Sequence, residues 1–309
     1  MRRPFSRHLL AALGLAGLLA ALGAAPAAAA IHTQSAKIAS KSVQVGVGTT
    51  GEVTAFCPKG YRATAGGASW DSPTRTGPAD FAFRELGASL PIQGGKGWYV
   101  NGENNDIEAA TLTVRVTCLR ATVIGPVTVR NAWFPSAGGA IKGSVACGAG
   151  KRVVAGGAAW QVQGDPLSAA DAEGHVLGGS APRPNAAGWL AMGTKSDPSS
   201  GASLRIIALC RPASWVGGYT VRTKTVEDVG IPIALPVYLA EGTVACPSGQ
   251  RIVTAGAYWQ NPFDNGGTPV ADGTLATSTP VGRFTWKVGA LPGASVDRNL
   301  VLIALCRPV

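Results

Sequence analysis

The feature that most constrains the fold of this chain is a pattern that occurs three times, each time running from a cysteine to a tryptophan. It reads C-x2-G-x-R-x3-[GA]-G-A-x-W at 57–70, 147–160 and 246–259. A second tryptophan and a closing cysteine follow in each copy: Trp98 and Cys118, Trp189 and Cys210, Trp286 and Cys306. Self-similarity at a regular spacing indicates a structural repeat. The chain is therefore predicted to contain three copies of one unit.

The repeats also define the expected domain boundaries. The similar segments VQVGV, VTVRN and YTVRT, which begin at residues 43, 127 and 219, predict the opening strand of each unit. The units are then 41–118, 125–210 and 217–309, with a flexible N-terminus at 31–40. Only the short connectors LRATVIG and RPASWVG separate them, which indicates neighbouring units in contact rather than on long flexible linkers.

Within each unit the sequence is typical of β structure. Short segments rich in Val, Ile, Thr and aromatic residues alternate with Gly, Pro, Asn and Asp, and no helical period extends over ten residues. The closing strands LRIIALC and LVLIALC are apolar on both faces, so their outer faces are expected to pack on another unit, a covering segment or a partner. We predict an all-β fold of three tandem sandwich-like or barrel-like modules of about six strands each. Because these strands are apolar on both faces, association of separate protein molecules into an oligomer is left open.

The N-terminus predicts export. Residues 1–30 have a basic start, a Leu/Ala-rich middle and a small-residue end, which is the plan of a cleaved signal peptide. The general secretory route is favoured over the twin-arginine route, although Arg2-Arg3 leaves the latter open. No later segment has the ~20 apolar residues of a membrane span. The mature protein is expected to be secreted and extracellular.

Six cysteines in an exported chain imply disulfides, and six allow fifteen pairings. If each repeat is a fold of its own, one pairing is favoured: Cys57 with Cys118, Cys147 with Cys210, and Cys246 with Cys306. A redox role is disfavoured because the chain has no C-x-x-C.

Tryptophan could serve either packing or ligand binding. Alternation along a strand places small residues, Gly66 and Ala68 in the first copy, beside a space that a bulky aromatic can fill. The second tryptophan of each unit is the expected occupant, so the six recurring tryptophans are assigned to packing. Trp133 and Trp215 do not recur and are the speculative ligand-binding residues. The dissimilar stretches 71–97, 161–188 and 260–285 are the expected variable binding loops.

Little in the sequence points to catalysis or to a cofactor. After removal of the signal only His32 and His175 remain, and neither lies in a known catalytic motif. His175 is interpreted as a solvated loop residue. Paired-carboxylate chemistry stays open, because its two acids can lie far apart in the chain. No cofactor and no metal site is predicted, although NGENNDIE at 101–108 and NPFDNGGTPVADG at 261–273 have the oxygen ligands that calcium prefers.

The charge is mildly basic. The formal net charge of +10 falls to +7 when residues 1–30, which hold Arg2, Arg3, Arg7 and no acid, are removed. The cations are scattered and no nucleic-acid-binding motif occurs, so nucleic acid is not an expected partner. Attraction to an anionic envelope or polysaccharide is easier to support.

The C-P-x-G start, the apolar strand into Gly-Gly and the apolar strand into the closing cysteine resemble a loose group of secreted actinobacterial proteins built from such modules. The resemblance covers nearly all of 41–309 and consists of scaffold residues, so it implies no active site. We expect a secreted, non-enzymatic binding protein that contacts a cell-surface polysaccharide or another extracellular protein. An inhibitor or accessory subunit of an extracellular enzyme, or an enzyme of unrecognised type, remains the alternative.

Overall fold

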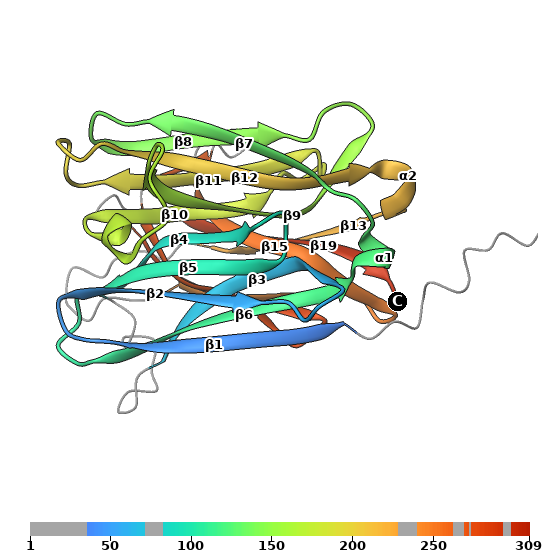
Figure 1. Cartoon of the computed structure of the whole chain (residues 1–309), viewed down its shortest axis with the longest axis horizontal. Helices are drawn as coiled ribbons and strands as arrows, with labels where there is room; N and C mark the ends of the chain where they lie inside the picture. Colours follow the sequence, from blue (N-terminus) through green and yellow to red (C-terminus); the bar gives the residue numbers. More distant parts are fainter. Residues whose placement is uncertain (1–35, 72–82, 228–239, 262–268, 272, 293–297) are drawn as a thin grey trace, which may run out of the picture. The chain divides into compact units, whose positions relative to one another are not determined.

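The computed structural model describes residues 36–71, 83–227, 240–261, 269–271, 273–292 and 298–309. The predicted signal peptide, His32 and most of the 261–273 stretch lie outside the described residues. The described part is almost entirely strand (Figure 1), which confirms the all-β prediction. The strands of the first repeat are β1 Lys37–Val45, β2 Thr49–Phe56, β3 Tyr61–Asp71, β4 Arg84–Ile92, β5 Gly97–Asn104 and β6 Ala110–Arg120.

The second and third repeats follow the same plan. The strands of the second repeat are β7 Thr128–Pro135, β8 Gly139–Ala146, β9 Lys151–Val162, β10 His175–Pro182, β11 Gly188–Lys195 and β12 Ala202–Pro212. Those of the third are β13 Thr220–Val226, β14 Ala240–Ala245, β15 Gln250–Gln260, the short β16 Pro269–Val270, β17 Gly273–Val281, β18 Thr285–Pro292 and β19 Asn299–Pro308.

Every sheet is shared by two repeats. The three sheets have the strand orders β1-β6-β3-β17-β18-β14, β13-β19-β15-β10-β11-β8 and β2-β5-β4-β9-β12-β7. Each repeat thus gives three strands to one sheet and three to another, with the short β16 of the third repeat added beside β15. Strands of the two halves of a repeat, such as β1 and β2, also contact each other. The first repeat joins the second and the third, and the third joins the second. The sequence does not reveal this exchange of half-sheets.

The repeated motif is the joint between repeats. The motif strands β3, β9 and β15 each pair with a strand of another repeat: Ala68 with Ser278, Ala158 with Ser89, and Ala257 with Ser180. The glycine before each alanine permits this approach. A Cβ added at Gly157 would lie 2.1 Å from the backbone oxygen of Ser89, and Gly67 and Gly256 meet the equivalent backbone as closely. Glycine is required here because a neighbouring strand occupies the space of a side chain.

The recurring tryptophans pack as the alternation predicts. A Cβ added at Gly66 would lie 2.3 Å from the ring of Trp98, and one at Gly156 would lie 2.4 Å from the ring of Trp189. All six recurring tryptophans have at most 2% of their surface exposed. The second tryptophan of each repeat donates its indole N–H to a serine on the adjacent strand: Trp98 to Ser89 at 3.0 Å, Trp189 to Ser180 at 2.9 Å, Trp286 to Ser278 at 3.1 Å. These serines, which satisfy buried indoles, were not singled out from the sequence.

The disulfides follow the predicted pairing. Cys57 bonds to Cys118, Cys147 to Cys210 and Cys246 to Cys306. Each bond ties the turn before a motif strand to the closing strand of the same repeat. The turn glycine of each copy has a positive φ, at 82° for Gly60, 67° for Gly150 and 74° for Gly249, which explains why glycine recurs there.

The two-faced closing strands pack on other repeats, as expected. Ile207 and Leu209 of β12 belong to a core cluster with residues of the first repeat, and Val301 and Ile303 of β19 pack with Met192 of the second. The connectors form the single helical turns α1 Ala121–Ile124 and α2 Ala213–Val216. No helix in the described ranges is long and apolar enough to cross a membrane.

Two expectations need correction. β1 begins at Lys37, which pairs with Cys118, so residues 37–40 belong to the first sheet rather than to a flexible N-terminus at 31–40. The dissimilar stretches 71–97, 161–188 and 260–285 are not simply loops. They contain β4, β10 and β17, which are largely buried because they are the strands that join the repeats. Their sequences differ, but hydrogen-bonded pairing uses the backbone and tolerates different side chains.

Candidate functional site: an arginine-lined cavity

Equivalent residues of the three repeats meet at one cavity beside the disulfides. Each motif strand carries a β-bulge two residues after its arginine, at Thr64, Val154 and Val253, where the pairing with the closing strand skips a residue. A bulge redirects a side chain relative to a regular strand. All three bulged residues line the cavity. Equivalent positions of the three repeats, which are far apart in the sequence, therefore line the same cavity.

The residue after the closing cysteine differs in charge between the repeats. This position also lines the cavity, and it is Leu119 in the first repeat but Arg211 in the second and Arg307 in the third. Arg251 of β15 adds another guanidinium. Arg211 is 2% exposed and Arg251 is 7% exposed. Two largely buried cations and one half-buried cation thus face the same space.

Charge and burial act together on these groups. Burial lowers the pKa of Arg251, and the neighbouring cations Arg307 and Arg283 lower it further. Burial also lowers the pKa of Arg211. The phenol of Tyr219, which donates to the carbonyl of Val153 at 3.2 Å, has a raised pKa from burial, opposed by Arg307, Arg211 and Arg152. Burial at the cavity thus disfavours the charged forms of Arg211 and Arg251 and the ionised form of Tyr219.

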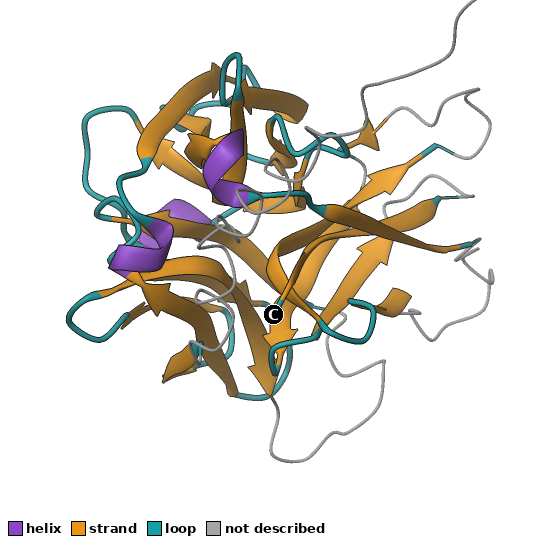
Figure 2. Cartoon of the chain, turned by 90° about the vertical axis from the view of Figure 1, so that its right-hand side faces the viewer, coloured by secondary structure: helices purple, strands orange, loops and turns teal. Residues whose placement is uncertain are grey.

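The first repeat contributes mostly apolar residues to the lining of the cavity. Val123 and Ile124 of α1 line the cavity together with Leu119. α1, α2 and the C-terminus lie at the same end of the described chain, which faces the viewer in Figure 2. The cavity volume is about 30 Å³, which is room for about two water molecules.

Trp133, one of the two speculative ligand-binding tryptophans, does not line this cavity. Trp133 lies on the edge strand β7, partly exposed, and the guanidinium of Arg205 stands 5.2 Å from its ring centre. Trp215 lies in α2, and its side chain is outside the described part of the structure. Arg251 belongs to the repeated motif identified from the sequence, but the other two arginines of the cavity, Arg211 and Arg307, were not singled out. The only signal for them is the Cys-Arg-Pro that ends the second and third repeats where the first has Cys-Leu-Arg.

The interpretation of His175 as a solvated loop residue is wrong. His175 is the first residue of β10 and is 5% exposed. Its Nε2 lies 2.6 Å from the Oγ of Ser200, and burial is the main cause of its lowered pKa. Lys195, on the strand paired with β10, donates to the backbone oxygens of Ser136, Ser200 and Ala202 and so holds the same loop. The histidine is buried because the 161–188 stretch continues into a joining strand.

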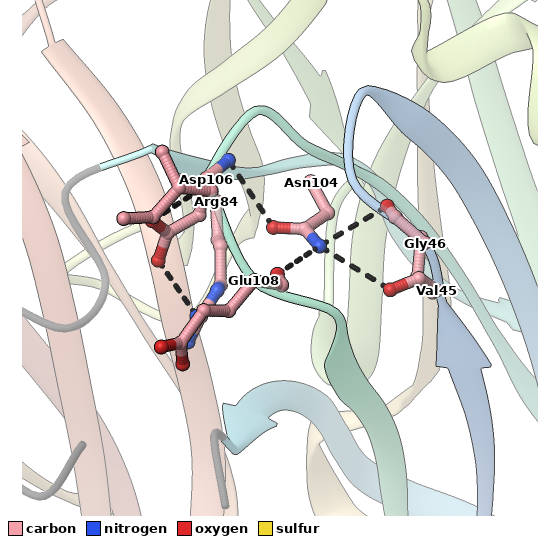
Figure 3. A network of polar contacts seen from close by, with 7 residues as sticks. Val45, Gly46, Arg84, Asn104, Asp106 and Glu108 are labelled. Atoms are coloured by element: carbon pink, nitrogen blue, oxygen red, sulfur yellow. Dashed lines mark hydrogen bonds and ion pairs between the residues drawn. The ribbon is translucent and has the colours of Figure 1, made fainter. Parts of the chain in front are cut away.

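The NGENNDIE stretch forms an internal network rather than an open set of oxygen ligands (Figure 3). Asn104 donates to the backbone oxygens of Val45, Gly46 and Glu108. The carboxylate of Asp106 is 2.7 Å from Arg84, and both side chains are buried. Across the described ranges, no three His, Cys, Asp or Glu side chains are grouped to hold a metal ion. The stretch ties β4 and β5 to the turn that follows β1.

A group of carboxylates lies on β2, β4 and β5, where the 3-10 turn Ala169–Ala172 (η3) of the second repeat packs on these strands. Glu85 is directly opposite Glu103 across the β4–β5 pair. The peptide N–H of Gly174 donates to Glu103, and the Tyr99 hydroxyl donates to Glu52 at 2.8 Å. Burial, and then the charge of Glu103, raise the pKa of Glu85 to about 7.

This shift predicts a pH-dependent stability. The folded state holds a proton on Glu85 below about pH 7, whereas the ordinary glutamate pKa of 4.5 applies to the unfolded chain. The folded state therefore binds more protons between these values, and stability falls as the pH rises through this window. At pH 8 the Glu85→Gln variant is expected to be more stable than the wild type by roughly 1–2 kcal/mol, a discounted figure because the carboxyl is partly exposed. Near pH 4 the two should be equal.

Urea unfolding across pH 4–9 measures this difference. Glu241→Gln is the matched control, because Glu241 forms a half-exposed ion pair with Lys287 at 3.1 Å and should change little. A constant offset between Glu85→Gln and wild type at all pH values would contradict the assigned titration.

Comparisons with known proteins add no functional assignment. Neither a scan against protein-family models nor a search of the curated proteins finds a match for this chain.

Proposed function

We propose that this chain is a secreted, non-enzymatic binding protein that contacts an anionic cell-surface polysaccharide or another extracellular protein. Three disulfides support an oxidising compartment, where such bonds form and persist. The signal peptide expected at residues 1–30 supports the same location.

The observation that carries the proposal is the division between repeated and unrepeated residues. The repeated cysteines, glycines and tryptophans are used in bonding and packing. The cavity, in contrast, is where equivalent positions differ in charge, from Leu119 to Arg211 and Arg307. A site made of guanidinium groups and apolar side chains is suited to holding an anion.

The exposed edge strands support an anionic partner. The opening strands β1, β7 and β13 each lie at the edge of a sheet, and they carry exposed cations. These are Lys37, Lys41, Arg130, Arg222 and Lys224. Charged residues on edge strands prevent edge-to-edge aggregation, so these cations also have a structural role. Their common sign adds a surface potential that attracts a polyanion.

Co-sedimentation with cell-wall polysaccharide tests this function. The purified oxidised protein is expected to sediment with a carboxylate-bearing or phosphate-bearing polymer, less with a neutral polymer, and less at 0.5 M salt, where screening is stronger. The double variant Arg222→Gln/Lys224→Gln should reduce the bound fraction without changing the unfolding midpoint. If the protein binds no polymer, and affinity capture from the culture medium yields no partner absent from a disulfide-bonded control protein, the proposal is wrong.

The contact between His175 and Ser200 favours a second candidate function, a serine-dependent hydrolase. A neutral imidazole 2.6 Å from a hydroxyl is the arrangement by which a base activates a nucleophile. Release of nitrophenol from short-chain esters would support it only if Ser200→Ala abolished the activity while Ser199→Ala, at the neighbouring exposed serine, did not.

A further inference from the structure

We propose that Trp133 and Arg205 form a binding site for a sugar ring that carries a carboxylate, such as a uronic acid residue of a polysaccharide. This inference deepens the proposed function, on which it rests, by naming the class of sugar and the pair of residues that contact it.

The two side chains are cross-strand neighbours on one face of a sheet. Trp133 of the edge strand β7 pairs with Arg205 of β12, which pairs in turn with Ala159 of β9. Alternation along β9 directs them to the face opposite Trp160, which is fully buried in the core. The guanidinium of Arg205 stands 5.2 Å from the ring centre of Trp133. Both side chains are partly exposed at the edge of the sheet.

The charge of Arg205 has no anionic partner among the described residues. Its Nη1 donates to the side-chain oxygen of Gln161 at 3.0 Å, and the Gln161 amide, 4% exposed, donates to the backbone oxygen of Asp165. Its Nε is buried without a hydrogen-bond partner. Burial lowers the pKa of Arg205, and within the described chain no carboxylate opposes this shift. A bound carboxylate would compensate a half-buried cation that Gln161 already holds in position.

The other two repeats show that the fold does not need this pair. Counted back from the closing cysteine, the equivalent pairs are Ser42 with Thr113 in the first repeat and Thr225 with Val301 in the third. Ser42 and Thr113 share a hydrogen bond of 2.9 Å and have neither a ring nor a charge. A partly exposed ring beside an unbalanced cation, present in one repeat alone, is better explained by a ligand than by packing.

The two groups select for one ligand chemistry. The face of an indole is apolar and negatively polarised, so it packs against the C–H bonds on one side of a sugar ring. A guanidinium fork matches the two oxygens of a carboxylate. Asn131, exposed two residues before Trp133 on the same face, adds an amide suited to hydroxyl groups. A uronic acid presents all three groups on one ring, whereas a neutral sugar or a small acid presents only part of them.

The repeats also supply conservative variants for the test. Trp133→Thr and Arg205→Thr install the residues that the third and first repeats have at these positions. Lys142→Thr is the matched control, because it removes an exposed cation from β8, the other edge strand of the same repeat. Unfolding midpoints of the three variants identify any loss of fold, and the comparison of probes on wild type does not depend on them.

Methyl glucuronide, methyl glucoside and sodium acetate are the probes, titrated at constant ionic strength by calorimetry and by protein NMR. Six of the eight tryptophans are at most 2% exposed, so their indole N–H signals should change little. The signal of Trp133 is the one lost in Trp133→Thr. Methyl glucuronide is expected to shift it saturably and to bind about tenfold or more tightly than methyl glucoside or acetate, as for one charge-assisted hydrogen bond.

The variants separate the two contacts. Arg205→Thr should bind methyl glucuronide and methyl glucoside equally weakly, because it lacks the group that distinguishes them. Trp133→Thr should lose saturable binding of both sugars in calorimetry, and Lys142→Thr should match wild type. The inference is overturned if methyl glucuronide at up to about 50 mM does not bind wild type. It is also overturned if either other probe binds as tightly, or if Lys142→Thr weakens binding as much as Arg205→Thr.

The outcomes also distinguish this inference from the proposed function. If wild type sediments with the polysaccharide but does not bind methyl glucuronide, the site at Trp133 and Arg205 is wrong and the proposed function stands. If methyl glucuronide binds and no polymer or protein partner is found, the function fails and the site stands.

Discussion

Replacing Gly157 with alanine is expected to lower the free energy of unfolding by about 3 kcal/mol or more, at the upper end of overpacking effects. The added Cβ would lie 2.1 Å from the backbone oxygen of Ser89 and 2.5 Å from the Cα of Leu90. Backbone cannot move aside as a side chain can, so the β4–β9 joint between the first two repeats must open. Guanidinium unfolding of the oxidised protein measures the loss.

Two further glycines serve as controls for this result. An added Cβ at Gly218 meets nothing within 4 Å, so Gly218→Ala should be neutral or slightly stabilising. Gly156→Ala should cost less than Gly157→Ala, because the third repeat has Ala255 at the equivalent position and still buries Trp286 to 1% exposure. Equal losses for Gly156→Ala and Gly157→Ala would show that the backbone contact between repeats is not what requires glycine.

Removal of the Cys147–Cys210 disulfide by replacing both residues with alanine is expected to cost about 4 kcal/mol, from the loop that the bond closes. The two cysteines are 63 residues apart, and both are fully buried. Alanine leaves no free thiol that could exchange with the other disulfides. Unfolding by guanidinium under non-oxidising conditions, with the other two disulfides verified by peptide mapping, gives the difference.

The other two disulfides provide matched comparisons. They close loops of 61 and 60 residues, so the corresponding double alanine variants should lose similar amounts. A loss below about 1 kcal/mol for all three variants would mean that the loops are already constrained in the unfolded chain, against the chain-entropy account.

The sequence predicts what lies inside one repeat and misses what lies between repeats. The strands, the disulfides and the packing of Trp98 over Gly66 follow from alternation and spacing, which are local properties. The pairing of Ala158 with Ser89 does not, because a motif strand that joins its own repeat or another one carries the same pattern. Self-similarity identifies equivalent strands, but it does not say which copy supplies the neighbour.

The cavity escapes prediction for a related reason. Its frame depends on bulges at Thr64, Val154 and Val253, and a bulge is a property of how two strands pair rather than of either strand alone. Its charge depends on Arg211 and Arg307, which read in the sequence as ordinary residues after a cysteine. Likewise, the sequence suggests a loop at His175 until β10, the strand that this residue begins, is placed against β15.

Each pair of repeats shares one sheet, so the three repeats form a closed circle. This closure fixes the number of repeats at three. Each copy uses its motif strand to join one neighbour and its serine-bearing strand to join the other, and the pairing of Ala68 with Ser278 connects the first copy to the last. An open array of repeats can grow by adding copies and needs caps at its ends. Here every joining strand is already engaged, so a fourth copy would find no place to attach. The same circuit means that a nascent chain cannot complete its first sheet until its last repeat has been synthesised.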